Sequence, residues 1–190
     1  MRERASETRR YGTPMGPLDG WRFCPRCAAE VAAEGGRVEC PSCGFVAYAN
    51  PVPAVSALVV DDAGRLLLAR RAVEPYAGMW DSLGGFLEEG EEPLEALRRE
   101  LLEEAAIEVD VGVFLGFFLD RYGGDDGSVS VLNLAWEASI SAGEPVPADD
   151  VAELRWFGRD ELPPDEEIAF TWLAPCLREW RTSSAEDGEG

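Results

Sequence analysis

The sequence contains no histidine, and this absence removes several kinds of chemistry. Neither a Cys-His catalytic pair nor a Cys₂His₂ zinc site can form without an imidazole. The chain also lacks any apolar run of 18 residues that would indicate a transmembrane helix. Residues 1–16 are polar and arginine-containing, without the apolar core of a secretory signal peptide. We therefore expect a cytoplasmic protein with no membrane partner, whose five cysteines are reduced.

Positive charge is also scarce. Seventeen basic residues stand against 37 acidic ones, which gives a formal net charge of −20. This charge repels the phosphate backbone that a nucleic-acid binder must neutralise, so we expect no nucleic-acid partner. It opposes a zinc-ribbon transcription or RNA factor for the same reason. A small phosphorylated substrate is compatible with the charge, because divalent cations can bridge protein carboxylates and phosphate oxygens.

The composition of the chain changes near residue 50. A cysteine-rich segment lies before Pro51, and apolar runs typical of a packed core follow it. At 190 residues, the chain is long enough for one main core and a small module. We predict a flexible N-terminal segment at 1–20, a cysteine module at 21–50, a main domain at 51–181 and a disordered acidic tail at 182–190.

Hydrophobic periodicity predicts the elements of the main domain. The β-branched run Val55–Val60, the turn at 61–64 and the apolar run Arg65–Arg71 indicate a hairpin. Further strands are expected at 109–119, 129–140 and 154–157, and helices at 93–106 and 170–180. This order favours an α/β (α+β) fold in which helices cover a mixed sheet.

The cysteine module contains two C-x-x-C pairs, Cys24 with Cys27 and Cys40 with Cys43, separated by twelve residues. Each pair can form a tight knuckle that presents two thiolates, and two knuckles complete a tetrahedral Cys₄ shell for Zn²⁺. A closed shell leaves no position for substrate, so the predicted zinc is structural and helps to fold a segment too short to bury a sufficient core. Two disulfides or a redox-active C-x-x-C are the alternatives. Cys176 stands alone and is expected to be a small buried hydrophobe.

The predicted helix at 93–106 separates two kinds of side chain. Apolar residues recur at helical spacing on one face, and three glutamates share another: Leu94, Leu97, Leu101 and Ala105 against Glu100, Glu103 and Glu104. Neighbouring carboxylates repel one another, and a cation relieves that repulsion. Oxygen-rich clusters of this kind suit Mg²⁺ or Mn²⁺. The alternative is an acidic helix face that is simply solvated.

The order of residues around these glutamates resembles the Nudix box. Reading along the chain, the matching positions are Gly85, Glu91, Arg99-Glu100-Leu101, Glu103-Glu104 and Ala106-Ile107, at the spacing of that motif. The resemblance implies an αβα sandwich with a mixed sheet, preceded by a zinc ribbon as in NADH pyrophosphatases and in FAD and ADP-ribose hydrolases. It also implies site residues: Glu100, Glu103, Glu104 and Glu91 as ligands of Mg²⁺ or Mn²⁺, Arg99 orienting them, and Glu100 or Glu103 as the base. Glu137 resembles the carboxylate that such enzymes supply from outside the box, when the segments are matched through Trp156.

The activity that the resemblance implies is hydrolysis of a nucleoside diphosphate linked to another moiety, such as ADP-ribose or FAD, with release of a nucleoside monophosphate. The partner is then a small molecule, and a homodimer stays open. The alternative is a catalytically silent, nucleotide-binding Nudix domain that uses its ribbon for interactions. Intact glutamates favour the enzyme.

Three departures from the family pattern affect these expectations. Ala106 replaces the usual glycine, which strains a turn if that residue needs a positive φ. Ser82-Leu83 stand where Leu-Pro is common. Phe117–Gly123 lacks both the Ser-Gln-Pro-Trp-Pro-Phe-Pro-x-Ser signature of NADH pyrophosphatases and the proline of many ADP-ribose pyrophosphatases. The first of these two absences argues against NADH as substrate.

Several further side chains could meet a substrate. Aromatic residues could stack on a base or flavin, and arginines could meet phosphate: Tyr76, Trp80, Phe86 and Tyr122, and Arg70, Arg71 and Arg121. For each aromatic residue, core packing is the commoner role.

Overall fold

Of the 190 residues, the computed structural model describes 17–123 and 129–183. They fall into two units, one including residues 17–50 and the other comprising Pro51–Tyr122 and the chain from Ser130 onward. The predictions for residues 1–16 and 184–190 lie outside the described residues. Pro17–Gly20 form a turn in which Leu18 is buried. None of the helices in the described part of the chain has the length and apolar character needed to cross a membrane.

The smaller unit is a three-stranded antiparallel sheet of short strands, β1 (Ala33–Glu34), β2 (Arg37–Glu39) and β3 (Val46–Tyr48). Two tight turns carry the cysteines. The Ala28 N–H donates to the Cys24 carbonyl at 2.9 Å, and the Gly44 N–H donates to the Cys40 carbonyl at 3.0 Å. The two donors occupy equivalent places and both have positive φ, 58° at Ala28 and 70° at Gly44. The two halves of the cysteine module are therefore built alike.

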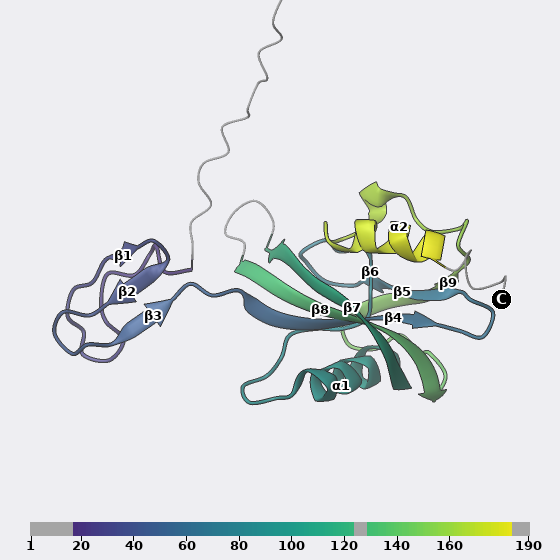
Figure 1. Cartoon of the computed structure of the whole chain (residues 1–190), viewed down its shortest axis with the longest axis horizontal. Helices are drawn as coiled ribbons and strands as arrows, with labels where there is room; N and C mark the ends of the chain where they lie inside the picture. Colours follow the sequence, from purple (N-terminus) through teal and green to yellow (C-terminus); the bar gives the residue numbers. More distant parts are fainter. Residues whose placement is uncertain (1–16, 124–128, 184–190) are drawn as a thin grey trace, which may run out of the picture. The chain divides into compact units, whose positions relative to one another are not determined.

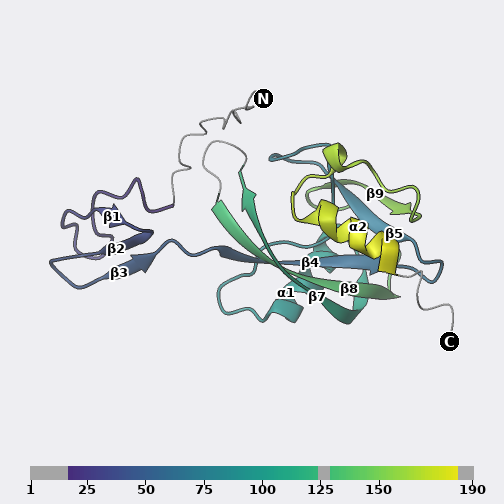
Figure 2. The same ribbon diagram turned by 45° about the horizontal axis from the view of Figure 1, so that its top comes forward.

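The larger unit contains a six-stranded mixed sheet (Figure 1). Its strands are β4 (Val52–Val60), β5 (Leu66–Arg71), β6 (Trp80–Asp81), β7 (Glu108–Tyr122), β8 (Val129–Ala142) and β9 (Val151–Phe157). The order is β6-β5-β4-β8-β7, with β9 also pairing with β5, and β4 and β8 are parallel. The two views show β7 and β8 side by side as a long twisted pair (Figure 2). The predicted strands are confirmed, whereas the two-residue β6 was not predicted.

Helices α1 (Pro93–Ala105) and α2 (Leu173–Ser183) cover opposite faces of this sheet, and a 3₁₀ turn, η2 (Asp165–Glu167), precedes α2 (Figure 1). Alternate residues of β4 serve the two layers: Val55, Ala57 and Val59 pack with α1, whereas Leu58 packs with α2. Leu97 and Leu101 of α1 are fully buried, and each contributes about 1.5–3 kcal/mol relative to exposure. The predicted αβα sandwich with a mixed sheet is confirmed.

Strands β4 and β5 diverge, and this opening positions the site. They pair only where Val59 and Val60 meet Leu67 and Leu66. Beyond that point, the segment 83–86 takes the place of β5 beside β4, with the Ala57 N–H donating to the Leu83 carbonyl at 2.8 Å and the Val55 N–H to the Gly85 carbonyl at 2.9 Å. The next segment of chain leads directly into α1.

Two glycines allow this close approach. Gly84 has φ +139°, and a Cβ there would lie 2.1 Å from the Val55 carbonyl oxygen. A Cβ on Gly85 would lie 2.5 Å from the Glu100 carboxylate. Gly84 requires the absence of a side chain, because a Cβ there would meet backbone, whereas a Cβ at Gly85 would displace the Glu100 carboxylate. The sheet, the glycine segment and the Glu100 carboxylate of the helix therefore lie in direct contact.

Proline at the first turn begins α1, and Ala106 ends it. Ala106 has φ 56° and ψ 33°, the left-handed conformation that glycine usually supplies at a helix end. The missing glycine of the sequence motif therefore falls on a residue that does need a positive φ.

Candidate active site

Arg99 on α1 gathers three of the four glutamates of the motif. Its Nε and Nη2 donate to the two oxygens of Glu91 at 2.8 and 3.0 Å. Its Nη1 donates to Glu100 Oε1 at 2.8 Å and to Glu103 Oε2 at 3.1 Å. The pairing lowers the pKa of Glu91 to about 2, because Arg99 and the Glu88 N–H both bind the ionised carboxylate. One guanidinium thus fixes side chains from a loop and from two turns of the helix.

Glu104 is held differently, by the backbone of the glycine segment. Its Oε2 accepts the Gly84 N–H at 2.9 Å, and the residue is buried. Burial raises the pKa of Glu104 well above its ordinary value, and the negative charges of Asp150, Asp81 and Glu100 raise it further. Burial also raises the pKa of Glu100, although Arg99 opposes that shift.

The two glutamates open onto a cleft of about 260 Å³. Its acidic end joins carboxylates from three regions of the chain: Asp81, Glu100, Glu104, Asp149 and Asp150. Asp81 pairs with Arg71 at 3.2 Å, and both side chains are largely buried. Burial nevertheless raises the pKa of Asp81 to about 6, against the opposing effect of Arg71. This end of the cleft therefore holds more negative charge than the neighbouring arginines neutralise.

The structure separates the residues that the sequence singled out. Glu100 and Glu104 line the cleft, whereas Glu91 and Glu103 stand around Arg99 beside it, with the Glu103 side chain 52% exposed. Glu137 is not brought to the cleft. It lies on β8 in a different depression, together with Asp61 and Asp110.

Four carboxylates that line the cleft were missed by sequence reasoning, and one of them, Asp120 on β7, accepts the Trp172 N–H at 3.0 Å. Asp81 belongs to the short β6, four residues before Gly85, and Asp149 and Asp150 precede β9. The sequence holds a weak signal for Asp81 and for Asp149-Asp150, because each adjoins a segment that leads into the core. Isolated aspartates near strand ends are common, however, and only the pairing of β5 with β6 and β9 brings these together.

Aromatic rings also line the cleft. Phe86 and Tyr122 meet edge to face at 5.2 Å between ring centroids, and Tyr122 stacks on Phe170 at 5.9 Å. Trp172 also lines the cleft, whereas Trp80 is buried in the core that packs against α2. Among the arginines considered from the sequence, Arg71 and Arg121 line the cleft, whereas Arg70 pairs with Glu153.

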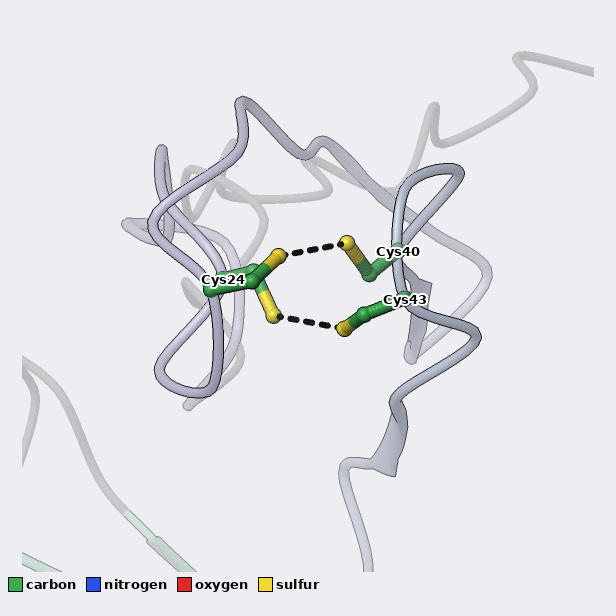
Figure 3. A group of neighbouring side chains, drawn as sticks. Cys24, Cys40 and Cys43 are labelled. Atoms are coloured by element: carbon green, nitrogen blue, oxygen red, sulfur yellow. Dashed lines mark hydrogen bonds between the residues drawn. The ribbon is translucent and has the colours of Figure 1, made fainter.

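The four cysteines of the smaller unit form a second cluster, in which side chains from the two C-x-x-C segments point toward one another (Figure 3). Cys24 Sγ lies 3.7 Å from Cys43 Sγ, and Cys27 Sγ lies 3.5 Å from Cys40 Sγ. Four thiolates at ~2.3 Å from a tetrahedral zinc ion are ~3.8 Å apart, so these separations suit the ion. The backbone N–H of Cys43 lowers the pKa of the Cys40 thiol to about 6, whereas, against the lowering effect of the Phe45 N–H, burial and the neighbouring cysteines raise the pKa of the Cys43 thiol to about 12. At least one thiolate of the cluster is therefore favoured. Cys176 is buried, as expected.

Comparison with known proteins gives consistent results. The sequence profile of the NUDIX domain matches residues 50–178. NAD-capped RNA hydrolase NudC of Pseudomonas aeruginosa is 30% identical over 146 residues, which are 75% of this chain and 50% of that protein. Mitochondrial NAD(P)H pyrophosphatase NUDT13 of Homo sapiens is 31% identical over 150 residues, 76% of this chain and 40% of that one. The chain thus spans about half the length, or less, of these curated relatives.

Solved structures show a similar architecture. The crystal structure of a NUDIX hydrolase from Nitrosomonas europaea superposes with a TM-score of 0.70 at 27% identity, and the match covers 87% of this chain and 93% of that one. Its coverage extends well beyond the motif helix, so the likeness includes the sheet and the covering helices.

Proposed function

The chain belongs to the Nudix family, and from this membership and the acidic cleft we propose that it hydrolyses the diphosphate of a nucleoside diphosphate linked to another moiety. The observation that carries the proposal is the convergence of Glu100 and Glu104 with Asp81 and Asp150 beside an aromatic surface. A diphosphate joined to a ring-bearing group needs both kinds of surface. The products would be a nucleoside monophosphate and a phosphorylated second moiety.

The donor set of the cleft suits Mg²⁺ or Mn²⁺, which prefer carboxylate oxygens. The negative charges of Asp150, Asp81 and Glu100 all raise the pKa of Glu104, and a divalent cation would relieve this repulsion. We propose Glu100 and Glu104 as ligands within the cleft. Glu103 and Glu91 are proposed to act from its rim, where both contact Arg99.

Residues of the chain are proposed to supply the base and to bind the phosphate. A bound divalent cation neutralises phosphate charge and favours ionisation of water. Glu100 is the best placed base, because its carboxylate lines the cleft. Arg99 orients Glu100, and Arg71 is placed to bind a phosphate oxygen. Water adds to one phosphorus, the bridging oxygen leaves with the other phosphate, and Glu100 takes the proton of the water.

The substrate is proposed to be a small dinucleotide or a nucleoside diphosphate sugar. By name, the relatives act on NAD-capped RNA and NAD(P)H, which favours substrates of the NAD type. Because the NADH signature is missing at Phe117–Gly123, ADP-ribose and FAD are proposed as candidate substrates together with those of the NAD type. Capped RNA ranks lower for this chain because its net charge of −20 opposes a polynucleotide.

The test is a panel assay with Mg²⁺ or Mn²⁺ and ADP-ribose, FAD, NADH, NAD-capped RNA, nucleotide sugars, diadenosine polyphosphates and nucleoside triphosphates, with release of monophosphate as the readout. We expect Glu104→Gln to lower turnover by about 10²-fold or more, because a carboxylate of the metal site becomes neutral. Glu95→Gln, on an exposed position of the same helix, is the matched control and should leave turnover unchanged. Full turnover in Glu104→Gln refutes the metal role. No hydrolysis of any substrate would favour a silent nucleotide-binding domain.

We further propose that residues 21–50 are a zinc ribbon and that residues 51–181 are the hydrolase domain. The separations between the cysteine sulfurs support the zinc assignment. The buried apolar side chains of residues 17–50 are only Leu18, Val38 and two of the cysteines, among the residues described there. So small a core needs a metal to hold it together.

A further inference from the structure

The buried polar residues of this protein gather at one place. In the described part of the chain, four polar or charged residues are buried, and all four line the cleft: Ser56, Ser82, Glu104 and Asn133. Burial of a polar group without a full set of hydrogen bonds costs about 1–3 kcal/mol. Because all four line the cleft, we attribute the burial of these polar side chains to a role in the cleft and not to packing of the core. Glu104 belongs to the acidic end, and the other three have no role in the proposed hydrolysis.

Ser56 and Asn133 form a pair on the floor of the cleft. They lie on the parallel neighbours β4 and β8, and they are 7% and 4% exposed. The Ser56 hydroxyl donates to Asn133 Oδ1 at 3.1 Å, and Asn133 Nδ2 donates to Ser56 Oγ at 2.9 Å. Each side chain therefore fixes the orientation of the other.

The pair does not use the full capacity of the amide. An asparagine side chain has two N–H donors and two acceptor lone pairs, and Ser56 takes up one of each. Over the residues that the structure describes, Ser56 is the only hydrogen-bond partner of the Asn133 amide. One donor and one acceptor therefore stay available at the floor of the cleft.

Apolar side chains flank the pair on its own strands, Ala54 on β4 and Val131 on β8. The rings of Phe86, Tyr122 and Phe170 line the same cleft. An aliphatic group would leave the amide unpaired, and a sugar lacks the flat face that packs best on aromatic rings. A planar heteroaromatic ring matches both features, because its face packs on aromatic side chains and its edge carries few polar atoms.

We infer that Ser56 and Asn133 bind the polar edge of a heteroaromatic base, and that Asn133 determines which base-bearing substrates the cleft accepts. The chemistry required is a flat ring with a hydrogen-bond donor or acceptor on its edge, as in a purine or a nicotinamide carboxamide. The inference rests on the proposed function, since the base is taken to belong to the nucleotide whose diphosphate lies at the acidic end. Asn133 is a specificity-determining residue here, with no part in the bond cleavage.

The experiment measures binding of ligands that cannot be hydrolysed, so that it does not depend on turnover. Isothermal titration with Mg²⁺ compares AMP, nicotinamide mononucleotide and ribose 5-phosphate, which share a phosphorylated ribose and differ in the base. We expect wild type to bind at least one of the two nucleotides about 10-fold or more tighter than ribose 5-phosphate, in line with the contribution of stacking a base on aromatic rings. Asn133→Leu should reduce this preference about 5-fold, and the affinity for ribose 5-phosphate should change less than about 2-fold. The nucleotide that loses more identifies the base.

Two further variants test whether the loss of base preference comes from the amide itself or from a general disturbance of the fold. Ser56→Ala removes the partner hydroxyl and leaves the amide, so it should weaken the same preference if Asn133→Leu fails to fold. Ser139 lies on β8, like Asn133, but outside the cleft. The Ser139→Ala variant should therefore bind all three ligands as wild type does. Equal affinity of wild type for ribose 5-phosphate and both nucleotides overturns the inference, as does absence of nucleotide binding or an equal loss for all ligands in Asn133→Leu. A failed hydrolysis panel with base-dependent binding intact would instead overturn the proposed reaction alone.

Discussion

Ala106→Gly should stabilise the protein, although the substitution removes a side-chain atom. Ala106 ends α1 with φ 56° and ψ 33°, and its side chain is exposed. Its N–H caps the helix by donating to the Leu102 carbonyl at 3.0 Å. Glycine adopts this conformation without strain and keeps the backbone hydrogen bond. No apolar contact of the core is lost in exchange.

The magnitude follows from two opposing effects. A residue with a Cβ pays about 1–2 kcal/mol in the left-handed conformation. Glycine is freer in the unfolded chain, which offsets about 0.5–1 kcal/mol of this gain. We therefore expect the free energy of unfolding to rise by about 0.5–1 kcal/mol, and Tm by about 1–4 °C for a protein of this size.

The measurement is urea unfolding of the zinc-loaded protein, followed by near-ultraviolet circular dichroism, with thermal unfolding beside it. Ala63→Gly is the matched control, because Ala63 is an exposed turn residue outside the set of residues with positive φ. That variant should be destabilised slightly, since glycine brings only extra freedom to the unfolded chain. An unchanged or lowered stability of Ala106→Gly would refute the assignment of strain to this residue.

Changes at three other places in the structure have expected outcomes. Gly85→Ala should lower turnover about 10-fold or more with little loss of stability, because the new Cβ displaces the flexible Glu100 carboxylate. Gly84→Ala should instead lower the urea concentration at which the protein unfolds, because the new Cβ meets the backbone of β4. Burial raises the pKa of Asp81 to about 6, above its value of about 3.9 in an unfolded chain, so without Mg²⁺ the urea midpoint should rise as pH falls from 7 toward 4. Asp81→Asn should make this rise smaller, with the remainder due to Glu104 and Glu100, whose pKa values burial also raises; a rise of unchanged size would contradict the assignment. Atomic spectroscopy should find one zinc ion per chain, and Cys24→Ser should release it; zinc retained at full occupancy would exclude the Cys₄ site.

Local spacing accounts for what the sequence could predict. Pro93 at the first turn and the apolar recurrence of Leu97 and Leu101 depend only on neighbours along the helix, and the structure has that helix at Pro93–Ala105. The hairpin of β4 and β5 is similarly encoded by two apolar runs and a short turn. The cysteine pairs were recognisable because each knuckle is formed by four consecutive residues.

The cleft could not be predicted in the same way, because long-range pairing assembles it. Asp81 reaches it through a strand of two residues, which is too short to show periodicity. Asp150 arrives from the opposite side of β5, ahead of β9. Glu137 is the converse case: matching of segments along the chain assigns it to the site, whereas its position on β8 places it in another depression. Distance along a sequence does not encode which edge of a sheet a side chain reaches.

Because β4 and β5 diverge, two interior amides of β4 are bonded to the glycine segment, and their exchange rates report on that segment. The amides of Val55 and Ala57 are hydrogen-bonded to the segment that carries the site glycines, and not to a neighbouring strand. Their exchange with deuterated solvent therefore measures how often that segment lifts away from β4. A ligand that holds Glu104 against Gly84 should slow exchange at these two interior amides, although neither is on the surface. Occupancy of the cleft can thus be followed from the middle of the protein without any label on the ligand.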